Sequence, residues 1–151
     1  MNNSIFKFIG NVFKRDHQNY EGVYRINIYL LRLLFFLIII FVGPESWHYI
    51  FNFKSTGDHV KAAAYAIWAS YSVLAIIGFI KPLLMIPIVL LEILYKLIWL
   101  TIVAYPLWSS GKLIGSPAEE MTFAFVWVIL AIIAVPWKYI FRKYILIIRK
   151  R

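Results

Sequence analysis

Long apolar runs separated by short polar turns dominate the pattern of the chain. Four runs approach or exceed the length at which a helix crosses a bilayer, about 18 to 20 residues. They predict spans over residues 26–42, 60–80, 83–108 and 117–141. Gly43 and Pro44 are expected to end the first span. The pattern therefore predicts a single all-α domain over residues 1–151, a four-transmembrane-helix bundle.

The beginning of the chain shows a helical period of another kind. Apolar residues recur at helical spacing, and polar or basic residues occupy the rest of the helical wheel. The apolar positions are Ile5, Phe8, Ile9, Val12 and Phe13, and the polar ones are Lys7, Asn11, Lys14 and Arg15. This spacing predicts an N-terminal amphipathic in-plane helix on the anionic cytoplasmic leaflet. A disordered tail is the alternative interpretation.

Composition supports insertion into a membrane and excludes several other classes. Hydrophobic residues make up 62% of the 151 residues, against roughly 45–50% in average soluble domains. The chain contains no cysteine, which excludes a disulfide, a thiol nucleophile and a cysteine-ligated metal. The net charge of +9 does not indicate nucleic-acid binding. The basic residues adjoin the spans, where they contact anionic lipid and set the topology.

Lysine and arginine are distributed unequally between the two ends of the predicted bundle. One side carries Lys54, Lys61 and Lys112. The opposite side, which contains both termini, carries Lys7, Lys14, Arg15, Arg25, Lys81, Lys138, Arg142, Lys143, Arg149, Lys150 and Arg151. Because basic residues are retained in the cytoplasm, this asymmetry predicts a multi-pass protein with both termini cytoplasmic.

Two charged residues, Glu92 and Lys96, lie in the middle of the third predicted span. Together they disfavour insertion of the span into the membrane by roughly 5 to 7 kcal/mol, and the aliphatic residues from 83 to 103 favour it by roughly 4 to 8 kcal/mol. The span therefore depends on pairing and on its neighbours. Glu92 precedes Lys96 by four residues, which is the favourable order on a helix. Self-neutralisation of the pair is one interpretation, and a polar binding site is the other.

A third charge, Arg32, lies about 9 Å inside the first span, and Glu92 lies about 13 Å inside the third span from the same side, at 1.5 Å per residue. Similar depths predict that the two side chains meet inside the bundle. The predicted ligand-binding network consists of Arg32, Glu92, Lys96, Tyr29, Ser70, Tyr71 and Trp99. Snorkelling of Arg32 to the cytoplasmic headgroups is the alternative.

The second predicted span carries many small residues. Ala62, Ala66 and Ser70 repeat every four residues, the small-xxx-small pattern of closely packed membrane helices. This face is predicted to pack against the other spans and to place the second helix centrally.

Signatures of catalysis and metal binding are weak. The sequence has no nucleophile elbow, no His-Glu-x-x-His motif and no glycine-rich phosphate loop. No histidine lies inside a span, so haem has no ligand there. Glu45 and His48, with Asp58 and His59 nearby, form only a loose set in one loop, and no metal site is predicted. The cofactor stays unassigned, and a non-enzymatic role is favoured.

Several stretches resemble a known family. "YLLRLLFFLIIIFVG", with Arg32 inside the span and Gly43 closing it, resembles the first span of DoxX-like proteins, which are small four-helix bacterial membrane proteins. "LAIIGFIKPLLMIPIVLL" resembles their second hairpin, and "LLEILYKLIWLTIVAYPLW" is similar to uncharacterised bacterial four-span proteins. Glu92 and Lys96 depart from the usual pattern. The resemblance implies a four-span topology and the bacterial inner membrane, and it transfers no catalytic residue.

The sequence thus predicts a small polytopic membrane protein that binds an amphipathic ligand, which is a lipid, a fatty acid or a quinone, at the buried polar network. One alternative is an accessory subunit that docks a larger membrane complex. Another is a quinone-linked redox protein with Glu92 as a proton relay. The expected partners are the bilayer and its anionic cytoplasmic leaflet. A homo-oligomer or a larger membrane complex is also considered, and nucleic acid is not.

Overall fold

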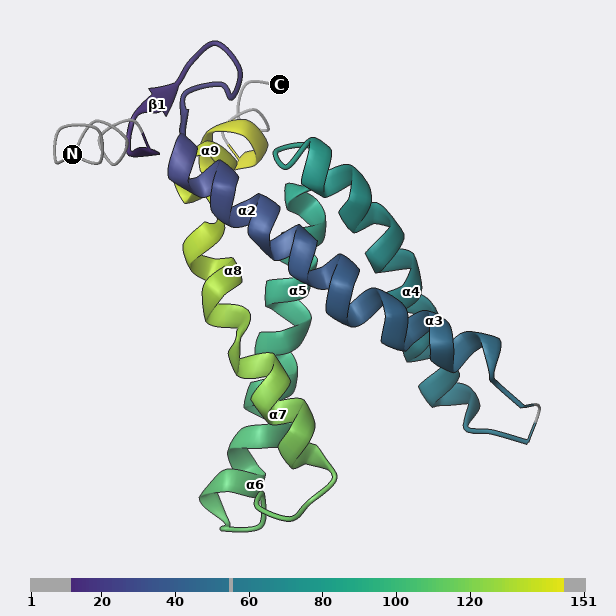
Figure 1. Ribbon diagram of the computed structural model, residues 1–151. Coiled ribbons are helices and arrows are strands. Elements are labelled where there is room, and N and C mark those ends of the chain that lie inside the picture. The colour runs from purple at the N-terminus through teal and green to yellow at the C-terminus, as the bar shows by residue number, and fades with distance from the viewer. Residues whose placement is uncertain (1–11, 55, 146–151) are drawn as a thin grey trace, which may run out of the picture.

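The computed structural model of the protein describes residues 12–54 and 56–145. Helices dominate this part of the chain (Figure 1). In chain order the elements are β1 (Arg15–Asp16), β2 (Val23–Tyr24), α2 (Arg25–Leu37), η1 (Ile38–Val42), α3 (Gly43–Phe51), α4 (His59–Ile80), α5 (Ile86–Trp99), η2 (Leu100–Ala104), α6 (Tyr105–Ser109), α7 (Ala118–Val126), α8 (Val128–Ala134), α9 (Trp137–Ile140) and η3 (Phe141–Ile145), where η marks a π-helical turn. The predicted in-plane helix falls largely within residues 1–11, outside the described residues, and stays a prediction.

Within the described residues, three continuous helices are long and apolar enough to cross a membrane. They are Arg25–Phe51, His59–Ile80 and Ile86–Ser109. Ala118–Ala134 and Trp137–Tyr144 make a fourth span if these two pieces, bent by 67° against each other, cross together. The all-α class is therefore confirmed, and the helices are those of a membrane protein with three or four spans.

The first helix does not end at Gly43 and Pro44, which corrects the expectation from the sequence. It continues to Phe51 through the π-helical turn η1, in which the Gly43 N–H bonds to the Ile38 carbonyl. A proline inside an α-helix clashes with the carbonyl four residues before it. The wider π-helical turn just before Pro44 relieves that clash, so the helix passes the proline without ending.

The third span contains the same arrangement. The π-helical turn η2 ends two residues before Pro106, and the Tyr105 N–H bonds to the Leu100 carbonyl. One helix therefore extends from Ile86 to Ser109 despite its internal proline.

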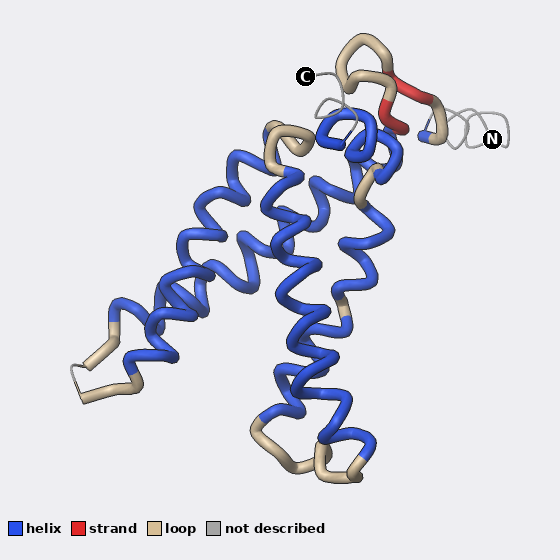
Figure 2. Tube along the Cα trace, turned by 180° about the vertical axis from the view of Figure 1, so that it is seen from behind, coloured by secondary structure: helices blue, strands red, loops and turns tan. Residues whose placement is uncertain are grey.

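The helices form two arms that diverge from a shared end (Figure 1 and Figure 2). In one arm α2 and α3 pack on α4, and in the other α5 and α6 lie beside α7 and α8. Helix α2 also contacts α8, which joins the arms close to α9 and the β1–β2 hairpin. The turn between α4 and α5 lies at this shared end, and the other two interhelical loops lie at the tips of the arms. The loops thus alternate between two ends, as successive membrane crossings require.

The core follows the inward face of α2. Ile28, Leu31 and Phe35 are buried there at helical spacing. The ring of Phe35 lies against Gly78 of α4, where an added Cβ would stand 2.5 Å from Cε1 of the ring. A residue without a side chain at position 78 therefore lets α2 and α4 approach closely.

Small residues of α4 do face α2 and α3, but they are not the predicted ones. Ala69, Ser72, Ala75 and Gly78 are buried, whereas Ala66 and Ser70 are exposed and Ala62 is half-buried. The Ala62–Ala66–Ser70 face thus lies outside the bundle, and α4 belongs to one arm rather than the centre. The helix has two small faces, and the buried one contains the glycine that accommodates Phe35.

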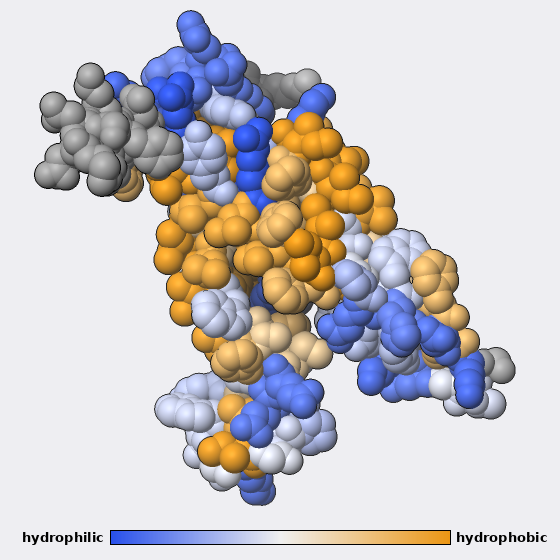
Figure 3. Space-filling view, in the orientation of Figure 1, coloured by the Kyte–Doolittle hydropathy of each residue, from blue (hydrophilic) through white to orange (hydrophobic). Residues whose placement is uncertain are grey.

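The surface of the molecule is apolar along its middle and polar at its ends (Figure 3). Exposed apolar side chains such as Leu33, Phe36 and Ile76 cover the helices between these ends. An apolar band between polar ends is the surface that a bilayer requires.

The bent pair that could form a fourth span breaks at Pro136, between α8 and α9. Because Pro136 has no N–H, the Ile132 carbonyl lacks its helical donor. The Trp137 Nε1 donates to that carbonyl at 2.9 Å instead. Asn27 of α2 donates through Nδ2 to the Ala134 carbonyl at 3.0 Å. These two side chains satisfy carbonyl groups that the bend releases, and Asn27 attaches the bend to the first span.

Candidate functional site

The charged pair in the third span forms a compact hydrogen-bonded group. The Lys96 Nζ donates to Oε1 of Glu92 at 2.6 Å, and the Tyr71 hydroxyl of α4 donates to Oε2 at 2.5 Å. Glu92 is only 3% exposed. The Lys96 ammonium also lies 5.7 Å from the centre of the Phe125 ring of α7, within the range of a cation–π contact. The i, i+4 pairing expected from the sequence is therefore present, and Tyr71 connects it to the other arm.

Two other residues of the predicted network lie elsewhere. Trp99 packs edge-on against Phe125, with ring centroids 5.1 Å apart, and does not hydrogen-bond the charged pair among the described residues. Ser70 is exposed and donates to the Ala66 carbonyl of its own helix at 2.9 Å. The structure thus brings Tyr71, Glu92 and Lys96 together and leaves Ser70 outside.

The Tyr71–Glu92–Lys96 group is self-contained. Each carboxylate oxygen of Glu92 accepts a hydrogen bond, and the ammonium of Lys96 cancels its charge. The cavity beside Arg32 and the hollow on α7 and α8 are lined by other residues. In a bilayer a satisfied, neutral group of this kind lowers the cost of two charges at mid-span and tethers α4 to α5.

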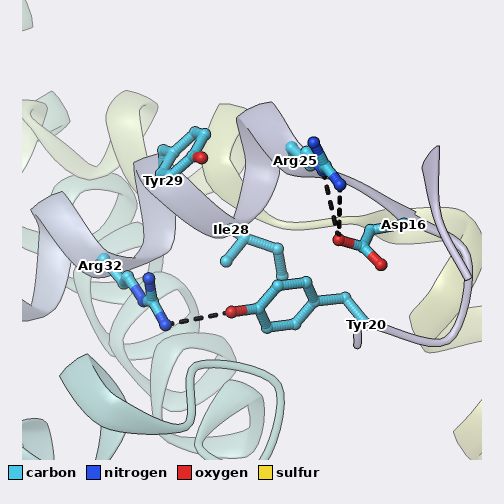
Figure 4. Close-up of a pocket in the computed structure, with 6 residues that line it drawn as sticks. All are labelled: Asp16, Tyr20, Arg25, Ile28, Tyr29 and Arg32. Carbon is cyan, nitrogen blue, oxygen red and sulfur yellow. Dashed lines mark hydrogen bonds and ion pairs between the residues drawn. The ribbon is translucent and has the colours of Figure 1, made fainter. Parts of the chain in front are cut away.

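Arg32 does not join this group. Its Nη2 donates to the Tyr20 hydroxyl at 3.1 Å, and no described carboxylate lies within 4.0 Å of its guanidinium. Arg32 instead lies beside a cavity of about 140 Å³ at the shared end of the arms. The lining of this Arg32 cavity consists of Asp16, Tyr20, Arg25, Ile28, Tyr29 and Arg32 (Figure 4). The face of the first span formed by Arg25, Tyr29 and Arg32 is therefore a site, but a separate one.

At one end of the cavity Asp16 pairs with Arg25. Oδ2 of Asp16 lies 3.2 Å from both Nε and Nη2 of Arg25. Oδ1 accepts a hydrogen bond from the Asn19 backbone N–H at 2.9 Å. The hydrogen bond from that N–H is the main cause that holds the pKa of Asp16 below its usual value, and Arg25 adds to it. Asp16 is consequently an anion at neutral pH, with Arg25 as its counter-ion.

At the other end Arg32 is the uncompensated charge. The Tyr20 ring lies between the two ends, with its hydroxyl directed at Arg32 (Figure 4). The Nε of Arg32 is buried and has no hydrogen-bond partner in the described structure. Buried donors on charged groups are rarely left unpaired, because the loss of water costs several kcal/mol. The guanidinium is therefore a donor and a charge that an anionic group in the cavity can satisfy.

The β1–β2 hairpin supplies Asp16 and Tyr20 to the cavity lining and is tied to α9 and η3. Oε1 of Glu21 accepts from the Lys143 Nζ at 2.9 Å and from the Tyr139 hydroxyl at 3.2 Å. The Arg142 Nη2 donates to the Glu21 carbonyl at 2.9 Å. The hydrogen bond from Lys143 is the main cause that lowers the pKa of Glu21. Glu21 thus fixes the hairpin above the start of α2.

Sequence reasoning missed Asp16 and Tyr20 as site residues. The signal was present in "DHQNYEG", because Asp, Asn and Gly are typical of tight turns. Glu21 and Gly22 both adopt positive φ, at 50° and 79°, and reverse the chain into β2.

Two further features bear on the chemistry of the protein. A hollow of about 470 Å³ on the outer side of α7 and α8 is lined mostly by apolar side chains, including Phe123, Val126 and Trp127. In the described residues, no three His, Cys, Asp or Glu side chains are placed to hold a metal ion.

In comparisons with known proteins, no family model, no curated protein and no solved structure matches this chain. The DoxX-like resemblance stays a prediction, and function is argued from geometry.

Proposed function

We propose that this protein is a four-span membrane protein that binds an anionic amphipathic molecule, with the headgroup in the Arg32 cavity and the tail along α2. The observation that carries the proposal is the Arg32 guanidinium. It faces a cavity, lacks a carboxylate partner among the described residues and leaves a buried N–H unpaired. Arginine in this state suits a phosphate or carboxylate, which its planar group binds through several hydrogen bonds.

The position of the cavity supports a lipid-like ligand. Arg32 lies seven residues, or about 10 Å, from the start of α2. If α2 begins at the membrane surface, that depth corresponds to the region where lipid headgroups meet acyl chains. A water-soluble anion would have to leave water to reach it, whereas the headgroup of a lipid is already there.

The surface next to the cavity suits an acyl chain. Tyr29 lines the cavity and is 52% exposed. Leu33 and Phe36 follow it at spacings of four and three residues, and both are exposed on the same face of α2. An apolar strip therefore leads from the cavity toward the middle of the bundle, in the direction that the tail of a bound lipid takes.

The size of the cavity decides how much of the ligand enters it. Its volume of about 140 Å³ is close to that of an engineered cavity of about 150 Å³ that holds benzene. A phosphate or carboxylate group fits this space, and a whole lipid headgroup with its glycerol does not. The cavity thus holds the charged group, while the rest of the molecule stays in the bilayer.

The proposal is tested by binding of palmitoyl-oleoyl phosphatidylglycerol to the full chain in detergent, measured by native mass spectrometry, with phosphatidylcholine of the same chains as reference. Arg32→Gln is expected to weaken phosphatidylglycerol binding about tenfold, the size expected for a charge-assisted hydrogen bond. Lys81→Gln removes one positive charge from the same end without touching the cavity, and it is expected to leave binding unchanged. Equal binding by Arg32→Gln and the wild type would refute the proposal.

The same preparations separate the quinone-linked alternative. A quinone carries no negative charge, so loss of the Arg32 charge is expected to weaken its binding less than that of an acidic lipid. Retention of a quinone at equal amounts in the wild type and Arg32→Gln, without bound acidic lipid, would favour a redox-linked role over anionic-lipid binding.

A further inference from the structure

The charges that line the Arg32 cavity set a limit on the charge of the ligand. Arg25 and Arg32 contribute two positive charges, and Asp16 contributes one negative charge. Asp16 already neutralises Arg25, at 3.2 Å from two of its nitrogens. Among the described lining residues, only Arg32 remains for the ligand, and together these residues carry a single uncompensated positive charge.

A ligand with one negative charge neutralises this lining. A second negative charge would lie in the same small cavity as the Asp16 carboxylate, without a further free cation among the lining residues. Like charges brought together at a partly buried site are unfavourable. Asp16 therefore neutralises Arg25 and also repels the second charge of a dianionic ligand. Specificity of this kind arises from a repulsive element in the site.

Asp16 is held firmly enough to exert this effect. Oδ1 is hydrogen-bonded to the Asn19 N–H and Oδ2 to Arg25, and the residue is 6% exposed. The hairpin that carries it is attached to α9 and the residues beyond through Glu21. The carboxylate is thus part of the wall rather than a mobile surface group.

We infer that the Arg32 cavity selects a headgroup with a single negative charge, a phosphodiester or a carboxylate, over a phosphomonoester. The inference rests on the proposed function and names the ligand class of the same site. Asp16 is the specificity-determining residue, because it excludes the second charge. Phosphatidylglycerol and a fatty acid carry one charge and satisfy the rule, whereas phosphatidic acid carries close to two at pH 8, above the second phosphate pKa of about 6.

The test compares phosphatidylglycerol and phosphatidic acid with identical acyl chains, bound to the full chain at pH 8 and measured by native mass spectrometry. The wild type is expected to prefer phosphatidylglycerol. Asp16→Asn keeps an oxygen that accepts from Asn19 but removes the charge, so the affinity ratio is expected to move toward phosphatidic acid by about fivefold, as for a partly exposed charge pair. Glu120→Gln removes an exposed negative charge at the start of α7, away from the cavity lining, and is expected to leave the ratio unchanged.

The outcomes separate the inference from the proposed function. If Arg32→Gln weakens both lipids but Asp16→Asn does not move the ratio, the inference is wrong and anionic-lipid binding stands. If Arg32→Gln has no effect on either lipid, the proposed function itself is wrong. An equal shift in Asp16→Asn and Glu120→Gln would indicate a general charge effect and would also overturn the inference.

Two further probes identify the source of the single charge. Oleate tests a carboxylate with one tail, and dimethyl phosphate tests a phosphodiester without a tail. Binding of oleate in preference to phosphatidic acid supports the charge rule with a fatty acid as ligand. Binding of dimethyl phosphate as tight as that of phosphatidylglycerol would overturn the lipid assignment, because the tail would then contribute nothing.

Discussion

Gly78 of α4 lies directly against the ring of Phe35 of α2, so that a Cβ at position 78 would stand 2.5 Å from the ring atom Cε1. Phe35 is fully buried, and the neighbouring Leu31 and Ala75 leave the ring no exposed direction in which to move. The contact fixes how closely α2 and α4 approach.

Gly78→Ala is therefore expected to destabilise the protein by about 1 to 3 kcal/mol through overpacking. Alanine favours a helix over glycine by about 1 kcal/mol. Helix propensity alone would therefore stabilise Gly78→Ala, so a loss of stability in this variant comes from the clash with Phe35. The measurement is the midpoint of thermal unfolding in detergent, followed by circular dichroism. Phe35→Leu in the same chain is expected to recover part of the loss.

Ala66→Leu provides the matched control on the same helix. It adds a much larger side chain at an exposed position, so the unfolding midpoint is expected to stay near that of the wild type. A large decrease of the unfolding midpoint in Ala66→Leu, with no decrease in Gly78→Ala, would mean that the packed face of α4 is the one that contains Ala66.

The mid-span group gives a second prediction. Tyr71→Phe removes the donor to Oε2 of Glu92 and leaves a buried charged oxygen with one partner fewer, at an expected cost of about 1 to 3 kcal/mol. Lys96→Met leaves the Glu92 carboxylate without its counter-ion and is expected to cost about 3 to 5 kcal/mol. Chemical or thermal unfolding in detergent measures both.

The double variant Glu92→Gln with Lys96→Met tests whether these costs come from the unpaired charge. Because both charges are removed, it is expected to be more stable than Lys96→Met alone. Binding of phosphatidylglycerol, normalised to folded protein, is expected to be unchanged in it. A selective loss of lipid in this variant would move the binding site back to the mid-span pair.

The sequence contained the pairing of Glu92 with Lys96, since both lie on one helix and the spacing alone determines their distance. It did not contain the position of Arg32 relative to them. Equal depth in the membrane specifies only the position of each side chain along the membrane normal. The order of the helices around the bundle determines whether two side chains at the same depth also lie side by side. Here α2 packs on α4 and α8, and its Arg25–Tyr29–Arg32 face turns toward the hairpin.

The hairpin shows a second limit of pattern reading. Its strands have two residues each, too short for an alternating pattern. Its Glu21 contacts residues more than a hundred positions later. Turn chemistry in "DHQNYEG" marks a reversal, but nothing local shows that Glu21 pairs with Lys143 or that Asp16 faces a cavity. The α-helical class and the candidate spans, by contrast, follow from long runs of consecutive apolar residues, a property that depends on no distant contact.

The Glu21 contact gives a prediction about pH. Its pKa lies below the ordinary value of 4.5, chiefly because of the hydrogen bond from Lys143. A depressed folded-state pKa stabilises the fold above the ordinary value, and this stabilisation is lost as the pH falls through the folded-state pKa. Since the pair is largely exposed, the wild type is expected to exceed Glu21→Gln by at most about 1 kcal/mol at pH 7.

Thermal unfolding of both proteins between pH 7 and pH 3 checks this expectation. The difference between their midpoints is expected to be constant down to about pH 4.5 and to close below it. A difference that persists at pH 3 would show that the Glu21 side chain acts through packing rather than through its charge.

The break between α8 and α9 gives the last prediction. Trp137→Phe keeps an aromatic ring but removes the Nε1 donor that satisfies the Ile132 carbonyl at 2.9 Å. The expected loss is about 0.5 to 1.5 kcal/mol, the net value of one hydrogen bond. Pro136→Ala restores an N–H at position 136, which can donate to the same carbonyl, so the cost of Trp137→Phe is expected to fall in that background. A double-mutant cycle of unfolding free energies measures the coupling, and strictly additive costs would mean that Trp137 does not replace the donor that proline lacks.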